Sequence, residues 1–127
     1  MNGTIFVTAR NGYNDGFGVG DATLNVDFEN NSVSGDFTLI NRDLNASDFA
    51  IPETSFAFEP APITANGFSG DITLTDGDIG GDLADAFYSG RFYGENAPTA
   101  GGQISATVDV DGEDQLTFIE GAFIATR

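Results

Sequence analysis

Apolar and polar residues alternate along most of this chain, and a period of two predicts β-strands. The alternation is clearest over residues 22–28 and 33–39, each with an apolar residue or glycine at every second position. Between them lies Glu-Asn-Asn-Ser at 29–32, and asparagine tolerates the positive φ angles of tight hairpin turns. We therefore expect a β-hairpin over residues 22–39 with one face buried.

The same alternation predicts more strands, and no segment shows a sustained helical period. They lie at residues 4–10, 48–51, 55–59, 68–74, 86–94, 103–110 and 116–126, the one at 48–51 being short. Short strands with regular turns and internal glycines favour a closed barrel over a sandwich. We predict an all-β fold, a small closed antiparallel barrel of about eight strands whose phenylalanine-rich inward rows pack the interior.

Three polar, glycine-rich or asparagine-rich segments interrupt the pattern and predict loops at 11–20, 41–47 and 75–85. Pro60 and Pro62 predict an edge or a turn after residue 59, because proline cannot donate a ladder hydrogen bond. In the last strand the apolar phase shifts after Phe118, which predicts a β-bulge near Ile119.

Residues 90–102, Gly-Arg-Phe-Tyr-Gly-Glu-Asn-Ala-Pro-Thr-Ala-Gly-Gly, form the most distinctive stretch. Phe92 and Tyr93 end a strand and Gly94 breaks it. We expect a short helical turn near residues 95–100 before the next strand begins.

Composition limits the function classes. The 127 residues suit a single domain, 1–127, and they include no cysteine and no histidine. Twenty Asp and Glu against four Lys and Arg give a net charge of −16, which disfavours nucleic acid and anionic membranes as partners. No apolar run is long enough to span a membrane, and the first residues do not resemble a signal peptide. Surface anchoring would require a signal or anchor outside this sequence.

Acidic residues around glycine turns offer a candidate calcium site. The candidates are Asp109, Asp111 and Asp114, with a second group at Asp76 and Asp78. Calcium takes six to eight oxygen ligands, and neither stretch has the glutamate that completes an EF-hand loop. Hairpin turns favour the same Asp-Gly pairs, so a structural role in turns is the alternative explanation for these residues. Apart from calcium, we expect no cofactor. Haem would lack an obvious axial ligand.

We expect no catalytic residues. Histidine, cysteine and lysine are absent, and among twenty carboxylates some pair will lie at a suitable separation by chance. The candidate binding residues are instead Tyr13 and Phe17, which are loop aromatics, and Arg42 and Arg91, which are isolated positive charges. The alternatives are that the two aromatics pack as a lid on the barrel and that each arginine pairs with a neighbouring carboxylate.

Three blocks resemble a known family. They are residues 90–102, the terminal Gly-Ala-Phe-Ile-Ala-Thr-Arg at 121–127, and the hairpin at 22–39, in the family's order. The chain resembles the β-barrel domains of the transferrin-binding protein B superfamily, whose relatives include factor H binding protein. It lacks the lipoprotein cysteine and the lysine-rich surface common among pathogen members, which points to a free-living exported relative.

The resemblance implies a non-enzymatic barrel, extracellular or on a bacterial cell surface, that recognises another protein. We expect the loops at 11–20, 41–50 and 76–85 to carry recognition. Two alternatives are a lipocalin-like carrier of a small ligand and a structural module of an extracellular adhesin or matrix protein.

Overall fold

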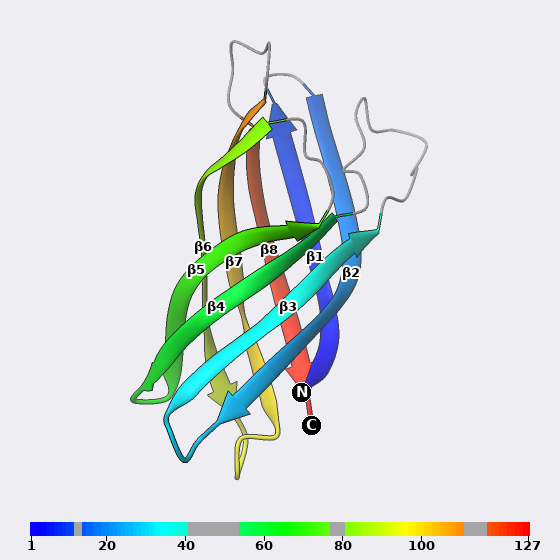
Figure 1. Cartoon of the computed structure of the whole chain (residues 1–127). Helices are drawn as coiled ribbons and strands as arrows, with labels where there is room; N and C mark the ends of the chain where they lie inside the picture. Colours follow the sequence, from blue (N-terminus) through cyan, green and yellow to red (C-terminus); the bar gives the residue numbers. More distant parts are fainter. Residues whose placement is uncertain (12–13, 41–53, 77–80, 111–116) are drawn as a thin grey trace.

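The structure is a computed structural model that describes residues 1–11, 14–40, 54–76, 81–110 and 117–127. These residues form eight strands (Figure 1). The strands are β1 (Asn2–Asn11), β2 (Asn14–Asp27), β3 (Ser32–Ile40), β4 (Thr54–Thr64), β5 (Gly67–Asp76), β6 (Gly81–Tyr93), β7 (Thr99–Val110) and β8 (Thr117–Thr126). The described residues contain no helix.

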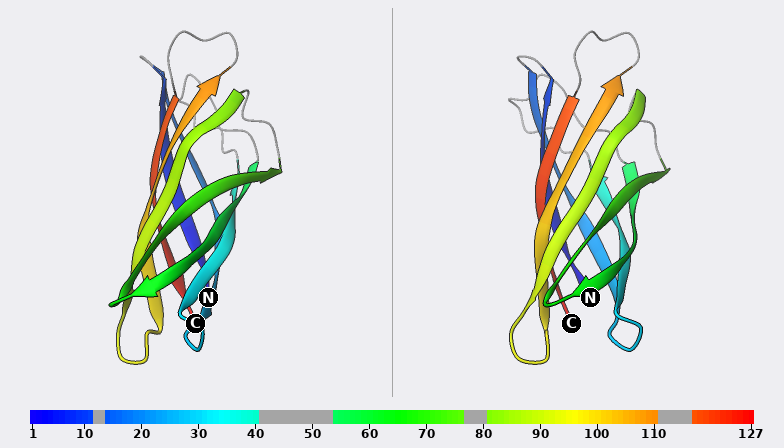
Figure 2. Two further views of the ribbon diagram at one scale, coloured as in Figure 1. Left: turned by 60° about the vertical axis from the view of Figure 1, so that its left-hand side comes forward. Right: turned by 90° about the vertical axis from the view of Figure 1, so that its left-hand side faces the viewer.

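Each strand pairs antiparallel with the next, and β8 returns to pair with β1, so the sheet closes into a barrel. The closing seam runs without interruption from Asn2 opposite Thr126 to Arg10 opposite Phe118. Figure 2 shows the strands tilted around the barrel axis. The predicted closed antiparallel barrel of about eight strands is confirmed.

The turn between β2 and β3 shows how the sequence fixes a hairpin. The Asp27 carboxylate accepts hydrogen bonds from the Asn30 backbone N–H at 3.1 Å and from Asn30 Nδ2 at 2.7 Å. These bonds lower the pKa of Asp27 below its ordinary value, the side-chain bond contributing most. Asn31 takes a positive φ of 53°, which asparagine tolerates better than most residues. The hairpin predicted over residues 22–39 is therefore present.

A cluster of aromatic rings fills the barrel. Its members are Phe37, Phe56, Phe58, Phe68, Tyr88, Phe92 and Phe123, all buried. Ring centroids lie 4.5 Å apart for Phe58 and Tyr88 and 5.3 Å apart for Phe58 and Phe123, within the range of favourable aromatic contacts. Among the described residues an apolar void of about 10 Å³ remains beside Phe37 and Phe56, no more than one water molecule needs. The interior is packed, as predicted.

Two predicted loops contain strand. β2 already begins at Asn14, opposite Asn11, so most of segment 11–20 is sheet, and β6 begins at Gly81 inside segment 75–85. Glycine made both segments look irregular, yet the sheet requires it at Gly20. A Cβ there would lie 1.7 Å from the carbonyl oxygen of Thr38 on β3.

The edge or turn predicted from proline after residue 59 is absent. Pro60 and Pro62 lie inside β4, where the pairing with β5 shifts register between Phe58 and Ile63. A register shift removes ladder hydrogen bonds, so proline costs less there.

The predicted bulge near Ile119 is wrong. β8 keeps one register against both β1 and β7, with Ile119 buried and Phe118 exposed. The apolar phase only seemed to shift because Phe118 is an apolar residue on the outer face. The strand expected at 48–51 lies outside the described residues.

Residues 94–98 form a tight turn, and the short helical turn expected near 95–100 is absent. Gly94, Asn96 and Ala97 have positive φ angles of 86°, 63° and 50°, incompatible with a right-handed helical turn. The Ala97 N–H donates to the Gly94 carbonyl at 3.2 Å, and β7 then begins at Thr99.

Candidate functional site

The barrel has two dissimilar ends. We call one the loop end: the strands there are joined through residues 12–13, 41–53, 77–80 and 111–116. At the other, the turn end, the strands are joined through 28–31, 65–66 and 94–98, and both chain termini lie there (Figure 1). This follows from the up-and-down topology, because alternate connections of such a barrel fall at the same end. Each of the three segments predicted to carry recognition therefore contains a connection at this end, although residues 14–20 and 81–85 are strand.

The candidate binding residues do not form one site. Tyr13 and Arg42 lie outside the described residues, in connections at the loop end. Phe17 lies within β2, opposite Thr8, and not in a loop. Arg91 lies on β6 near the turn end, between Gly67 of β5 and Gly101 of β7.

The calcium candidates are only partly described. Asp78, Asp111 and Asp114 lie outside the described residues. Asp76 ends β5 and Asp109 lies on β7, and these strands are separated by β6. In the part of the chain that the structure describes, no group of three or more acidic side chains is placed to hold a metal ion. Calcium binding at the loop end stays a prediction.

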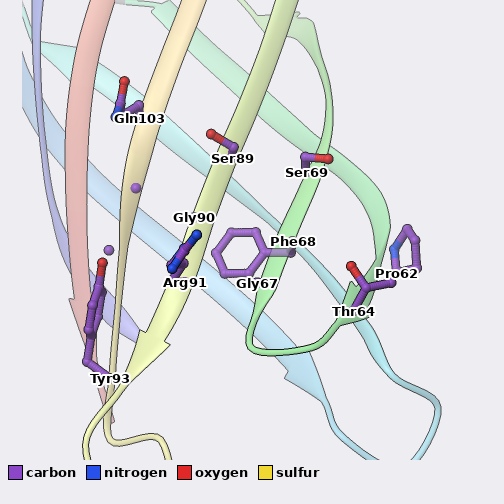
Figure 3. A pocket seen from close by; sticks show the side chains of 12 residues that line it. Pro62, Thr64, Gly67, Phe68, Ser69, Ser89, Gly90, Arg91, Tyr93 and Gln103 are labelled. Carbon is purple, nitrogen blue, oxygen red and sulfur yellow. The ribbon is translucent and has the colours of Figure 1, made fainter.

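A groove on the outer wall near the turn end was not predicted. It crosses β4, β5, β6 and β7 and has a volume of about 440 Å³ (Figure 3). We call it the outer groove. Its lining residues are Pro62, Thr64, Gly67, Phe68, Ser69, Ser89, Gly90, Arg91, Tyr93, Gly101, Gly102 and Gln103.

Glycines form the floor of the outer groove. Gly90 lacks a side chain where the Phe68 ring lies, so a Cβ there would meet Phe68 Cζ at 2.5 Å. At Gly102 a Cβ would lie 2.0 Å from the Ser89 carbonyl oxygen, so only glycine fits. The Tyr93 ring lies beside Gly101, where a Cβ would be 3.6 Å from Tyr93 Cε2. Gly90 and Gly102 lie opposite each other and face the barrel interior. The side chains missing from the outer face are those of Gly67 and Gly101, on either side of Arg91, and their absence leaves the hollow.

The walls of the outer groove are polar and free of carboxylates. None of the twelve lining residues is Asp or Glu, although these make up 20 of the 127 residues of the chain. Arg91 is exposed, and Tyr93 is 53% exposed. The structure gives Arg91 no ion pair within the described residues, so the carboxylate partner considered for it is not found there.

Sequence reasoning missed this groove because it depends on cross-strand register. Ser69, Ser89 and Gln103 are unremarkable in sequence, and they become neighbours because Ser69 lies opposite Ser89, and Ser89 opposite Gln103. The available signal was the glycine-rich stretch around Gly90 and Gly102.

These features define a class of protein: a closed up-and-down β-barrel with a packed core. Residues 2–127 match the sequence model of the family described as the C-lobe and N-lobe beta barrels of Tf-binding protein B. The chain belongs to this family, as its resemblance implied.

A solved structure has the same fold. It is the crystal structure of a mutant of the vaccine antigen transferrin-binding protein B from Haemophilus parasuis, with a TM-score of 0.52 and 18% sequence identity. The match covers 100% of this chain and 27% of that chain, so the present chain spans about a quarter of the length of that protein. No curated protein matches the sequence. Among the described residues, no helix is long and apolar enough to cross a membrane.

Proposed function

We propose that this chain is a non-enzymatic binding module, displayed outside the cell or on a bacterial surface, that recognises another protein through the loop end. The observation that carries this proposal is the long connection 41–53 at the loop end. The connections at the loop end include the longest in the chain, residues 41–53, whereas those at the turn end are short turns. Long connections on a rigid barrel are suited to binding, because they accept sequence changes without disturbing the core.

The charge of these connections suggests the kind of partner. In sequence they contain one positive residue, Arg42, and seven acidic residues: Asp43, Asp48, Glu53, Asp78, Asp111, Glu113 and Asp114. A basic face on the partner would complement this end, and association would slow as salt screens the attraction. The name of the Haemophilus protein states that it binds transferrin. For this chain we propose a partner with a basic face and do not identify that partner further.

The packed interior counts against the carrier alternative. The inward rows are filled by aromatic rings, and the void beside Phe37 and Phe56 is too small for an organic ligand. Recognition of a protein by the outside of the barrel needs no cavity.

The test uses the two loop-end aromatics. We expect the double variant Tyr13→Ala with Phe17→Ala to weaken partner binding by about 30-fold or more, since truncating a hot-spot aromatic costs about 2 kcal/mol. The partner is first enriched from extracellular proteins of the source organism on the immobilised chain and identified by mass spectrometry. Its affinity for each variant is then measured by biolayer interferometry.

The control is Tyr93→Ala, an aromatic truncation near the turn end. We expect this variant to bind the partner as the parent chain does. If Tyr93→Ala loses binding and the double variant keeps it, the loop end is not the recognition surface. A large fall in melting temperature of the double variant would instead show that Tyr13 and Phe17 pack as a lid.

A further inference from the structure

The outer groove lies near the turn end and takes no part in the proposed recognition by the loop end. Apart from the buried ring of Phe68, its side chains point outward from β4, β5, β6 and β7 around an open hollow (Figure 3). All of its residues are described, and its volume of about 440 Å³ is in the range of small-molecule sites. It therefore needs an explanation of its own.

The polar side chains of the groove are not occupied by the protein itself. Within the described part of the chain, the side chains of six lining residues make no hydrogen bond or ion pair. These residues are Thr64, Ser69, Ser89, Arg91, Tyr93 and Gln103. Together they offer a guanidinium, hydroxyl groups and an amide, which both donate and accept hydrogen bonds. Such a set suits a ligand with many hydroxyl groups better than an apolar ligand.

The positive charge of the groove favours a ligand that carries a carboxylate. Arg91 is the lining residue with a formal charge, in a chain of net charge −16. A guanidinium binds a carboxylate through two parallel hydrogen bonds, a geometry that lysine cannot supply. The absence of Asp and Glu from the lining leaves the guanidinium available for a carboxylate from outside.

Tyr93 supplies the remaining element of recognition. Its ring is 53% exposed and lies beside the bare backbone of Gly101. An exposed aromatic ring packs well against the apolar C–H face of a sugar ring, while its hydroxyl stays in water. Arg91 and Tyr93 are two residues apart on β6 and project from the same outer face.

We propose that the outer groove binds a carboxylate-bearing saccharide, such as a uronic acid unit, with the carboxylate on Arg91 and the sugar ring on Tyr93. Ser69, Ser89 and Gln103 bind the ring hydroxyls. The lack of outward side chains at Gly67 and Gly101 admits the sugar ring close to the backbone.

The test compares two ligands that differ in one group. Methyl β-D-glucuronide and methyl β-D-glucoside share a ring, and only the first carries a carboxylate. Each is titrated into chain labelled with ¹⁵N-glycine, and amide shifts are followed by NMR at ~0.15 M salt, where the Debye length is about 8 Å and distant carboxylates are screened. We expect Gly67, Gly90, Gly101 and Gly102 to shift with the glucuronide, while Gly3 on β1 and Gly20 on β2, strands that do not line the groove, stay fixed.

Variants separate the two contacts. We expect Arg91→Gln to weaken glucuronide binding by at least about tenfold, the loss of a charged hydrogen bond, and to leave glucoside binding unchanged. Tyr93→Ala should weaken both ligands. Arg127→Gln is the matched control: it removes the same charge, but Arg127 lies over the Phe28 ring at 5.4 Å and outside the groove.

Three outcomes would overturn the proposal. One is that no groove glycine shifts at ~10 mM glucuronide, about ten times a Kd of ~1 mM. Another is that Arg91→Gln, with an otherwise parental glycine spectrum, binds the glucuronide as the parent does. The third is that sodium acetate shifts the same glycines with equal affinity, which would mean that the groove recognises a carboxylate without the sugar.

Discussion

Tyr88 shows how one residue joins the barrel core to its wall. The side chain is fully buried among the rings of the core, and its hydroxyl donates to the Glu59 carbonyl oxygen at 2.6 Å. Burial, and then the negative charges of Glu59 and Asp71, raise the pKa of Tyr88 to about 12. The polar tip of a core aromatic is thus held neutral and hydrogen-bonded.

This pKa predicts a loss of stability in alkali. In the unfolded chain a tyrosine ionises near pH 10, whereas folded Tyr88 keeps its proton until about pH 12. Below pH 10 both states are protonated and stability is unaffected. Between pH 10 and 12 only the unfolded state releases the proton, so the free energy of unfolding should fall by up to about 3 kcal/mol.

The measurement is urea unfolding at a series of pH values. Tyr88→Phe should be less stable near neutral pH by about 1 kcal/mol, because the hydrogen bond is lost, and should lack most of this alkaline fall. Tyr93→Phe, at an exposed tyrosine, should keep it. An equal alkaline slope in Tyr88→Phe and the parent chain would contradict the assignment.

The residue scale also shows why the candidate sites were only partly predictable. Arg91 was identified from sequence because positive charges are rare here, but its surroundings were not. The neighbours that make its groove polar come from β5 and β7, and only the register Gly67–Arg91–Gly101 brings them together. A single sequence shows which residues alternate outward, but it does not show which strands' outward residues meet.

At the scale of elements, apolar alternation was sufficient to predict most strands, and glycine caused most of the errors. Residues 14–20 and 81–85 look like loops because glycine has a low intrinsic strand preference. The tertiary structure overrides that preference where backbones come too close for a side chain, as at Gly20 and Gly102. Pairing registers, bulges and the turn at 94–98 depend on neighbours distant in sequence, so local patterning did not determine them.

The adjacent glycines Gly101 and Gly102 provide a matched test of this argument. A Cβ at Gly102 would lie 2.0 Å from the Ser89 carbonyl oxygen, whereas at Gly101 the nearest atom would be 3.5 Å away. We expect Gly102→Ala to lower the free energy of unfolding by about 1–3 kcal/mol, the usual cost of overpacking. Gly101→Ala should leave stability unchanged or raise it by up to about 1 kcal/mol, because alanine restricts the unfolded chain.

Chemical denaturation of the two variants checks this directly. Equal stabilities would contradict the close approach of β6 and β7 at Gly102. A loss confined to Gly101→Ala would mean that the register between these strands is shifted by one residue.

At the scale of the whole molecule, the residues that stabilise the barrel differ from those proposed to bind ligands. The closed sheet and its aromatic core carry the fold, the loop end is proposed to bind a protein, and the outer groove near the turn end is proposed to bind a saccharide. The net charge of −16 acts on all three, because like charges repel across the whole surface. Such a field destabilises the compact state, and salt relieves it.

This repulsion predicts that salt stabilises the chain. Raising NaCl from ~10 mM to ~0.15 M shortens the Debye length from about 30 Å to about 8 Å, which screens repulsion between exposed charges farther apart than that. We expect the melting temperature to rise by a few degrees, since about 1 kcal/mol shifts it by roughly 4 °C in a domain of 127 residues. A triple variant, Asp21→Asn, Asp36→Asn and Glu120→Gln, changes exposed strand residues and reduces the net charge from −16 to −13. Its melting temperature should be higher at low salt and should rise less with salt, as followed by circular dichroism. If the parent and the triple variant respond equally to NaCl, the effect is one of the salt on water and not of charge repulsion, and the acidic surface is not a stability cost.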